Sequence, residues 1–360
     1  MATIHELPTP SVLVDRARVA ANIKSMQEDC AAHGVELRPH VKTHKMVAVG
    51  RMQLDAGARG FTCAKLGEAE ALLPSGVRRV FLAHSLVDPR QAPRIAALSE
   101  RLDEFVVAAT SGPQAVALDR LAGLAGRRLP VMLAVDTGLG REGVRSLADA
   151  QALAAQIGRS GHLELHGFYT HEGQMYSVVP GGQQAASDEA LAKLASVRDA
   201  IAPGLPLWPG SSVNARRMAR SGRVQAVRPG AYVFGDLSLS QVCRVMEPGE
   251  VALTVLATVV DLPEPGLALI DAGSKAFSGD KTPDGVHASS ADGRELSVMR
   301  VNEEHGYVRG SAVASLRIGD RLRFVPAHVC TVVNLTDEVV VVEGESVVDR
   351  WEVEARGKVR

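Results

Sequence analysis

The sequence predicts an α/β fold in which a (β/α)8 barrel is followed by a mostly β domain. Short β-branched runs alternate with stretches of helical spacing over residues 15–232, as in repeated βα units around a parallel sheet. Eight such runs are present, and no GxGxxG sequence follows the first, which argues against a doubly wound sheet. Helical spacing nearly disappears after Phe234. We therefore assign residues 11–238 to the barrel, and residues 239–360 with residues 1–10 to the β domain.

The first predicted barrel strand is VELRPHVK at residues 35–42, and an amphipathic helix over residues 16–32 precedes it. Polar residues or glycines end nearly every predicted strand, where a barrel places its chemistry. The other seven predicted strands are GFTCA (60–64), RVFLAHS (79–85), EFVVAAT (104–110), PVMLAVDTG (130–138), LELHGFYTH (163–171), LPLWPGSS (205–212) and VQAVRPGAY (224–232). Helices are predicted between them at 66–73, 113–125, 146–158 and 185–201. In the β domain, strands are predicted at 251–262, 266–273, 321–329 and 338–344.

The composition is that of an ordinary globular protein, with 46% hydrophobic and 22% charged residues and a net charge of -1. This balance gives no basic surface for nucleic acid or for an anionic membrane. The four cysteines form no CxxC pair, which favours a reducing compartment. The N-terminus lacks a signal-peptide pattern, and no apolar run approaches the ~18–20 residues that cross a bilayer. We expect a cytoplasmic protein.

Lys42 is the first candidate for chemistry, because it ends the first predicted strand. A lysine at a strand end is by itself more often a surface charge. In a barrel, however, this position faces the mouth, where partial desolvation and neighbouring cations make an amine more nucleophilic. His40 lies on the same face of the strand as Lys42 and Arg38 lies deeper. Such a lysine suits a covalent bond to an aldehyde cofactor.

Two glycine turns favour a phosphate-bearing cofactor. LWPGSS at residues 207–212 and VRPGAY at residues 227–232 end the seventh and eighth predicted strands. Barrel enzymes frequently bind phosphate at the loops that follow these two strands. Each turn alone is weak evidence, because turns generally contain such residues. Together with Lys42 on the first strand, they predict pyridoxal 5'-phosphate held at its two ends.

A third candidate cluster is FVPAHVCTVVNLTD at residues 324–337. If this chain is extended, His328 and Cys330 project to the same side, as two ligands of one metal ion do. The alternative is a purely structural role, with a buried cysteine beside a histidine and no metal. Arg141, in a glycine-spaced loop, is either an anion clamp or a loop charge. Tyr169 and His171 alternate at the end of the sixth predicted strand, so both can face the barrel mouth.

With these residues identified, the chain resembles the D-threonine aldolase and D-serine dehydratase family. The resemblance covers nearly the whole chain and implies an alanine-racemase-like fold (fold type III), pyridoxal phosphate, a divalent metal and a homodimer. It also implies a small D-amino acid as substrate, with neither nucleic acid nor membrane as a partner. The motifs that carry it are TPSVLVD, RPHVKTHK, TGLGREGV, HGFYTHEGQMY, VRPGAYVFGD, IDAGSKAFSGD, NEEHGYV, HVCTVVNLTD and VVDRWEVEARG.

The resemblance also implies roles for individual residues. Lys42 matches the lysine that bonds to the cofactor, Arg141 an arginine near its phenolic oxygen, and Tyr169 a tyrosine that contacts its pyridine nitrogen. His328 and Cys330 match the ligands of the divalent metal, zinc or manganese. The remaining matches are His171, near the substrate hydroxyl, and the phosphate-binding turns Gly210, Ser211, Ser212, Gly230, Ala231 and Tyr232.

We therefore expect a lyase that acts on D-3-hydroxy-α-amino acids. In the dehydratase route Lys42 removes the α-proton, the metal assists departure of the β-hydroxyl, and a 2-oxo acid and ammonia result. In the aldolase route the hydroxyl loses its proton, with His171 as a candidate base, and glycine and an aldehyde result. Cys330 favours dehydration and zinc, because aldolases of the family carry aspartate there and dehydratases carry cysteine. More remote alternatives are an amino-acid racemase and a non-catalytic pyridoxal-phosphate carrier.

Overall fold

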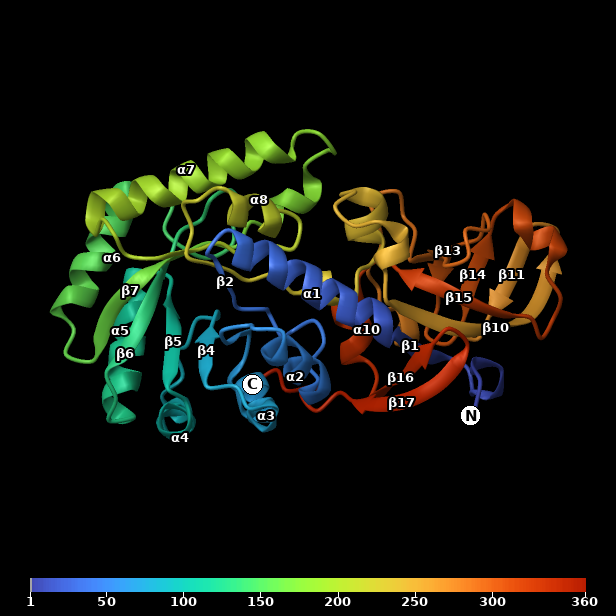
Figure 1. Cartoon of the computed structure of the whole chain (residues 1–360), viewed down its shortest axis with the longest axis horizontal. Helices are drawn as coiled ribbons and strands as arrows, with labels where there is room; N and C mark the ends of the chain where they lie inside the picture. The colour runs from blue at the N-terminus through green and yellow to red at the C-terminus, as the bar shows by residue number, and fades with distance from the viewer. Residues whose placement is uncertain (1) are drawn as a thin grey trace. The chain divides into compact units, whose positions relative to one another are not determined.

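The computed structural model describes residues 2–360, which divide into two compact units (Figure 1). We call them the barrel unit and the β unit. The barrel unit consists of Ser25–Lys42, Val49–Gly230 and Lys358–Arg360. The β unit consists of the described residues up to Lys24, Thr43–Ala48 and Ala231–Gly357. Helix α1 (Arg16–Ala32) is divided between the two units after Lys24.

Eight parallel strands form the barrel unit, which confirms the predicted (β/α)8 fold. Strands β3 to β8 make one sheet in chain order, and β2 pairs with β9. Hydrogen bonds join the two sheets on both sides, from Val41 N–H to the Thr62 carbonyl (2.9 Å) and from Gln225 N–H to the Leu207 carbonyl (3.2 Å). The strands are β2 (Glu36–Leu37), β3 (Phe61–Cys63), β4 (Arg79–Leu82), β5 (Glu104–Ala109), β6 (Leu129–Ala134), β7 (Leu163–Tyr169), β8 (Leu207–Trp208) and β9 (Ala226–Val227).

Helices follow the barrel strands and pack on the sheet through their apolar sides. The helix predicted over residues 16–32 is present with the same bounds as α1. Helices α3, α5, α6 and α7 agree with their predicted ranges within two residues, whereas no bounds were predicted for α2, α4 and α8. The helices are α2 (Val47–Asp55), α3 (Leu66–Ala71), α4 (Ala92–Arg101), α5 (Gly112–Leu124), α6 (Leu147–Arg159), α7 (Gln183–Ile201) and α8 (Ala215–Arg220).

Three barrel strands are much shorter than predicted, and proline explains each case. The strand predicted at residues 35–42 is regular only at Glu36–Leu37, because Pro39 has no N–H to donate. His40 then forms an isolated bridge to Thr62, and residues 41–44 form a turn. Lys42 therefore lies in a turn just beyond the strand. Strand β8 is flanked by prolines on both sides, and a proline follows β9 two residues after its end.

The barrel interior combines an aromatic cluster with a buried ion pair. Phe81, Tyr169 and Trp208 are buried together, and the Phe81 ring packs edge-on against the other two at 5.0 and 5.6 Å. The Arg38 guanidinium lies over the Trp208 ring at 4.2 Å and pairs with Glu104. Arg38 thus lies deep in the barrel, as predicted from its position two residues before His40.

The β unit is built from nine strands in one sheet, in the order β11-β14-β13-β12-β15-β10-β1-β16-β17. Strand β10 also pairs with β11, so six of the strands close into a ring, and β1, β16 and β17 extend from it. All pairs are antiparallel except β1 with β16. The strands are β1 (Ser11–Asp15), β10 (Leu253–Glu264), β11 (Leu267–Ile270), β12 (Ala288–Ser290), β13 (Ser297–Val301), β14 (Gly306–Arg309), β15 (Arg321–Pro326), β16 (Glu338–Glu343) and β17 (Ser346–Glu352).

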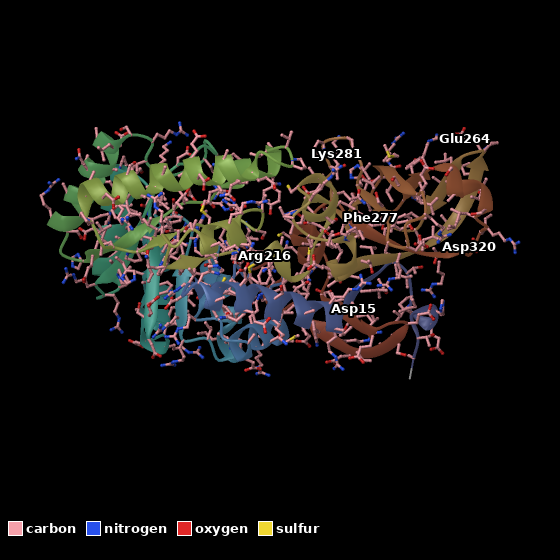
Figure 2. The ribbon with its side chains drawn as sticks, turned by 45° about the horizontal axis from the view of Figure 1, so that its top comes forward. Asp15, Arg216, Glu264, Phe277, Lys281 and Asp320 are labelled. Atoms are coloured by element: carbon pink, nitrogen blue, oxygen red, sulfur yellow. The ribbon has the colours of Figure 1, made fainter. Side chains whose placement is uncertain are left out.

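Two short helices complete the β unit, α9 (Ser274–Phe277) and α10 (Val329–Asn334). Phe277 of α9 packs edge to face on Phe324 of β15, with ring centroids 6.1 Å apart, and both side chains are fully buried (Figure 2). Over residues 2–360, no helix has both the length and the apolar character needed to cross a membrane.

Candidate active site

Lys42 is half-buried and lies among positive charges. Its backbone N–H points at Nδ1 of His40, 3.4 Å away. Burial lowers the pKa of His40 well below its ordinary value, and the nearby charges of Lys42 and Arg228 lower it further. His40 is therefore a neutral imidazole next to the lysine. A neutral neighbour leaves the lysine without a counter-ion from this side.

Arg228 is a buried cation that sequence reasoning did not single out, although it stands inside the VRPGAY motif. Its guanidinium donates to the backbone carbonyls of Thr170 (2.6 Å) and Trp208 (3.1 Å). Burial lowers the pKa of Arg228 to about 10, so it stays charged at neutral pH. Gly210 must be glycine here, because a Cβ at this position would lie 2.6 Å from the guanidinium.

Tyr169 ends β7 beneath the barrel mouth. Its hydroxyl is buried and has no hydrogen-bond partner among the described residues. Burial raises the pKa of Tyr169, so the hydroxyl keeps its proton at neutral pH. The Arg228 guanidinium lies over the ring at 5.2 Å. An unpaired buried donor is costly, and an acceptor atom from a bound molecule relieves that cost.

His171 and Glu172 follow β7 and contact the loop after β8. Nδ1 of His171 donates to the carbonyl of Gly210, so Nδ1 carries the hydrogen and Nε2 presents a lone pair. Burial, together with the charge of Lys42, lowers the pKa of His171 to about 3. Glu172 accepts from the N–H of Gly210 (3.0 Å), and burial raises its pKa to about 7. His171 is thus a neutral hydrogen-bond acceptor at physiological pH.

The two glycine turns predicted to hold phosphate lie against each other. The N–H of Gly230, after β9, donates to the hydroxyl of Ser212, after β8, at 3.1 Å. The Ser211 hydroxyl accepts from the N–H of Val213 at 3.3 Å. The next two predicted residues, Ala231 and Tyr232, are buried and begin the 3-10 helix Ala231–Val233 of the β unit.

Arg141 lies in the loop after β6, with its side chain 54% exposed and 3.7 Å from Glu142. It lines one small cavity together with Tyr169 and His171. Arg141, Lys42 and Arg228 are all close enough to lower the pKa of His171. The barrel unit thus surrounds this site with three cations. That excess, with the unpaired Tyr169 donor, fits an anionic cofactor that carries an acceptor atom, as pyridoxal phosphate does.

His328 and Cys330 are neighbours in the β unit, but not because they alternate along an extended chain, as their spacing predicted. They do not lie on an extended chain, because β15 ends at Pro326 and α10 begins at Val329. His328 caps this helix and Cys330 lies in its first turn. The thiolate of Cys330 raises the pKa of His328, and a side-chain hydrogen bond joins the two.

Asp236 and Thr43 also contact this pair. No motif in the sequence indicated that Asp236 belongs to the site. The carboxylate of Asp236 is fully buried and lies 3.1 Å from Nδ1 of His328. It also accepts from the N–H groups of Leu239 (2.9 Å) and Val329 (3.2 Å), which fix its orientation. The Thr43 hydroxyl lies 3.1 Å from the sulfur of Cys330.

This donor set fits a soft divalent ion. Nδ1 of His328 is engaged by a carboxylate, which makes Nε2 the ring nitrogen that can bind a metal, as in carboxylate–histidine–metal arrangements. A thiolate beside an imidazole suits zinc. No group of three His, Cys, Asp or Glu side chains that could hold a metal is present in residues 2–360. A site with two protein ligands is still compatible with a catalytic metal, because such metals commonly keep coordination positions open for water or substrate.

Comparison with known proteins identifies related chains over nearly the full length. The family model for the N-terminal domain of alanine racemase matches residues 14–238, and that for a putative serine dehydratase domain matches residues 252–342. A D-threonine aldolase from Arthrobacter sp is 30% identical over 98% of this chain and 94% of its own. A D-threo-3-hydroxyaspartate dehydratase from Delftia sp. (strain HT23) is 34% identical over 91% and 92%. A D-serine dehydratase from Dictyostelium discoideum is 24% identical over 95% of each chain.

Solved structures give the same picture. A D-threonine aldolase from Filomicrobium marinum has a TM-score of 0.90 at 26% identity, covering 99% of this chain and 97% of that one. The Delftia dehydratase has a TM-score of 0.87 at 31% identity, covering 98% and 99%. Two variants of this dehydratase carry alanine in place of a histidine and of a cysteine two positions later. The cysteine variant is in a metal-free form.

Proposed function

Because the chain belongs to the D-threonine aldolase and D-serine dehydratase family of pyridoxal-phosphate-dependent lyases, we propose that it is a dehydratase of D-3-hydroxy-α-amino acids. The products are a 2-oxo acid and ammonia. The observation that carries the choice is the His328–Cys330 pair, a histidine and a cysteine two positions apart. Residues of these types and this spacing are the ones replaced in the Delftia dehydratase variants.

We propose that His328 and Cys330 bind one divalent ion, zinc or manganese, with Asp236 holding the imidazole through Nδ1. A thiolate ligand favours zinc over manganese. When bound, the ion supplies a Lewis acid for the departing hydroxyl, and pyridoxal phosphate supplies an electron sink. Thr43 contributes a hydroxyl next to the sulfur and directly follows Lys42 in the sequence.

When pyridoxal phosphate is bound, Lys42 would hold its aldehyde and, once its amine is free, would take the α-proton of the substrate. Tyr169, whose raised pKa keeps it protonated, would donate its hydroxyl hydrogen to the pyridine nitrogen. Arg141 would supply a cation to stabilise negative charge on the phenolic oxygen. The phosphate is held at the contacting turns after β8 and β9, by Gly210, Ser211, Ser212, Gly230, Ala231 and Tyr232.

One observation favours the aldolase as the second candidate. His171 is neutral at physiological pH, and its Nε2 lone pair is the nitrogen not engaged by Gly210. A neutral imidazole can accept the proton of a substrate hydroxyl, which is the step that retro-aldol cleavage requires. In the dehydratase, the same nitrogen orients the hydroxyl by accepting its hydrogen bond. By resemblance we also infer a homodimer, and from the cysteine pattern a cytoplasmic protein.

Product analysis tests the proposal. The purified protein, loaded with pyridoxal phosphate and zinc or manganese, is given D-serine, D-threonine and D-threo-3-hydroxyaspartate. Ammonia with a 2-oxo acid in equal amounts supports the dehydratase, whereas glycine with an aldehyde establishes the aldolase instead. Exchange of the α-proton without metal and without either product set establishes a racemase. Lys42→Ala should lose activity by about 100-fold or more, and the exposed Lys281→Ala serves as the matched control (Figure 2).

A further inference from the structure

The β unit contains a cavity of about 230 Å³ that shares no residue with the candidate active site. It is partly open to solvent and is lined by the N-terminal segment around Ile4, by β10 and β15, and by the turn that carries Asp292. Strand β15 turns Arg321, Arg323 and Val325 toward one face while Leu322 and Phe324 are buried on the other. The first three of these side chains line the cavity.

Four arginines line this cavity, and the carboxylates there do not balance them. Its two acidic side chains already have partners, since Asp292 pairs with Arg294 (2.8 Å) and Glu345 with His5 (3.5 Å). The other three arginines, Arg18, Arg321 and Arg323, form no ion pair with either of these two carboxylates.

Arg323 is the least compensated of these cations. Its Nε donates to the hydroxyl of Thr254 (3.2 Å), and no carboxylate lies within ion-pair distance of it in the described chain. Burial and the nearby charge of Arg18 lower the pKa of Arg323, and the charges of Asp15 and Glu345 offset this only in part. The Arg18 guanidinium donates to the carbonyl of Val251 (2.8 Å), and its one carboxylate contact is a long one, to Asp15 (3.5 Å) at the end of β1 (Figure 2).

Arg321 adds donors that the fold itself does not fully use. It donates to the carbonyls of His5 and Leu7, which attaches the N-terminal segment to the ring. Its Nε is buried and has no partner among the residues described. Buried apolar residues, Ile4, Val251 and Leu256, also line the cavity. The cavity thus offers both guanidinium groups and hydrocarbon to a bound molecule.

We propose that this cavity binds a small dianion with a short hydrocarbon body, and that the guanidinium of Arg323 is its principal contact. Arginine pairs with carboxylates and phosphates through two parallel hydrogen bonds, which suits either a dicarboxylate or a phosphate ester. The volume holds an ion of that size beside the apolar wall. Occupation compensates the charge of Arg18 and Arg323 and so stabilises the β unit.

The test measures thermal unfolding of the holoenzyme against increasing inorganic phosphate or succinate, with sodium chloride at matched ionic strength. Succinamide, which has the shape of succinate without its charges, is the neutral control. We expect a saturable rise in Tm with one or both anions and none with succinamide. A response to succinate alone assigns a dicarboxylate, and a response to phosphate alone assigns a phosphate ester.

Arg323→Gln should weaken the anion's apparent Kd by about 10-fold or more, since a charge-assisted hydrogen bond is lost. Arg309→Gln is the matched control, because Arg309 is an exposed arginine of the same unit that pairs with Glu264 (2.9 Å). Arg18→Gln gives a second variant that leaves the Arg323–Thr254 contact in place and should also weaken binding. No rise beyond that of sodium chloride, or a rise that survives Arg323→Gln, would overturn the proposal.

Discussion

At the residue scale, the four cysteines of the chain have different surroundings. Burial raises the pKa of Cys30 to about 12 and of Cys243 to about 11, so both remain thiols at neutral pH. Cys330 instead lies beside His328 and within 3.1 Å of the Thr43 hydroxyl. A thiolate is the form that binds metal, so surroundings separate Cys330 from cysteines that only fill space.

We expect Cys330→Ala to lose the divalent metal. One of two protein ligands disappears, and the remaining imidazole binds an ion too weakly to hold it through dialysis. The measurement is the molar ratio of zinc or manganese to protein after dialysis, by elemental analysis. Cys243→Ala also removes a thiol and should keep the ratio of the unmodified protein. Equal metal content in the two variants would show that Cys330 is not a ligand.

Glu172 should make stability fall as pH rises. Burial raises its pKa from 4.5 to about 7, and its Oε1 has no partner in the described structure, so the folded state prefers the protonated form. This contribution is complete below pH ~4.5 and is lost as the pH passes ~7. Glu172→Gln does not titrate and keeps an acceptor for the N–H of Gly210.

Between pH ~4 and ~8, the unmodified protein should therefore lose about 3 kcal/mol of unfolding free energy relative to Glu172→Gln. Urea unfolding at several pH values measures this difference. Glu189→Gln, an exposed substitution with the same change of charge, is the control. A difference that stays constant over this range would mean that folding does not raise the pKa of Glu172.

The sequence identified Lys42, Tyr169 and His171 because each stands at or near the end of a predicted strand. The structure places them in one unit, where the charge of Lys42 acts on His171 and Tyr169 lines one small cavity with His171. Asp236 and Arg228 escaped notice for a physical reason. Their importance comes from burial and from contacts with residues that are distant in the sequence. Neither burial nor such contacts can be read from the spacing or type of a single aspartate or arginine.

At the scale of elements, the shortest strands of the barrel are tied together by one side chain. Arg38 follows β2 and is buried, with its guanidinium over Trp208 of β8 at 4.2 Å. It pairs with Glu36 at 2.9 Å and with Glu104 of β5. Strand β2 has only two residues of regular pairing, so side-chain contacts supply much of what holds it in place.

Arg38→Met should therefore destabilise the protein by about 3 kcal/mol, because two carboxylates lose their buried cation. Chemical denaturation measures the change. Arg78→Met removes the exposed Arg78–Asp103 pair and should cost much less, because solvent screens an exposed ion pair. Adding Glu104→Gln to Arg38→Met should restore part of the loss. Equal costs for the two arginine variants would show that the Arg38 pair stabilises no more than a surface pair.

The alternation of strand and helix was predictable because each element carries its own periodicity. The number of barrel strands and their order follow from that pattern. Strand lengths did not follow, since Pro39, Pro206 and Pro209 end regular pairing inside runs that are otherwise β-like. The same limit applies to His328 and Cys330. Their spacing favoured an extended chain, whereas the chain turns into a helix between them.

At the scale of the whole molecule, β1 joins parts of the chain that are far apart in sequence. It pairs with β10 on one side and with β16 on the other, which attaches the β16–β17 hairpin to the six-stranded ring. Leu13 and Val14 of β1 are fully buried. Without β1, two strand edges and a row of apolar side chains lose their partner.

Deletion of residues up to Asp15 should therefore prevent folding of the β unit. We expect insoluble protein, or protein without the cooperative unfolding transition, when the shortened chain is examined by circular dichroism. Deletion of Met1 and Ala2 alone removes one described hydrogen bond, from the N–H of Val347 to the carbonyl of Ala2, and should be tolerated. A soluble, cooperative protein lacking β1 would contradict this account of the sheet.

The position of β1 also sets an order of events at the ribosome. Strand β1 ends at Asp15 and is made before all the barrel strands, whereas β10 begins at Leu253 and β16 at Glu338. At about 5–20 residues per second, its first partner arrives on the order of 10–50 s later. During that time an apolar strand remains without a sheet while all eight barrel strands emerge. Slowing translation lengthens the time for which β1 is exposed. A chaperone that binds the nascent strand reduces that exposure.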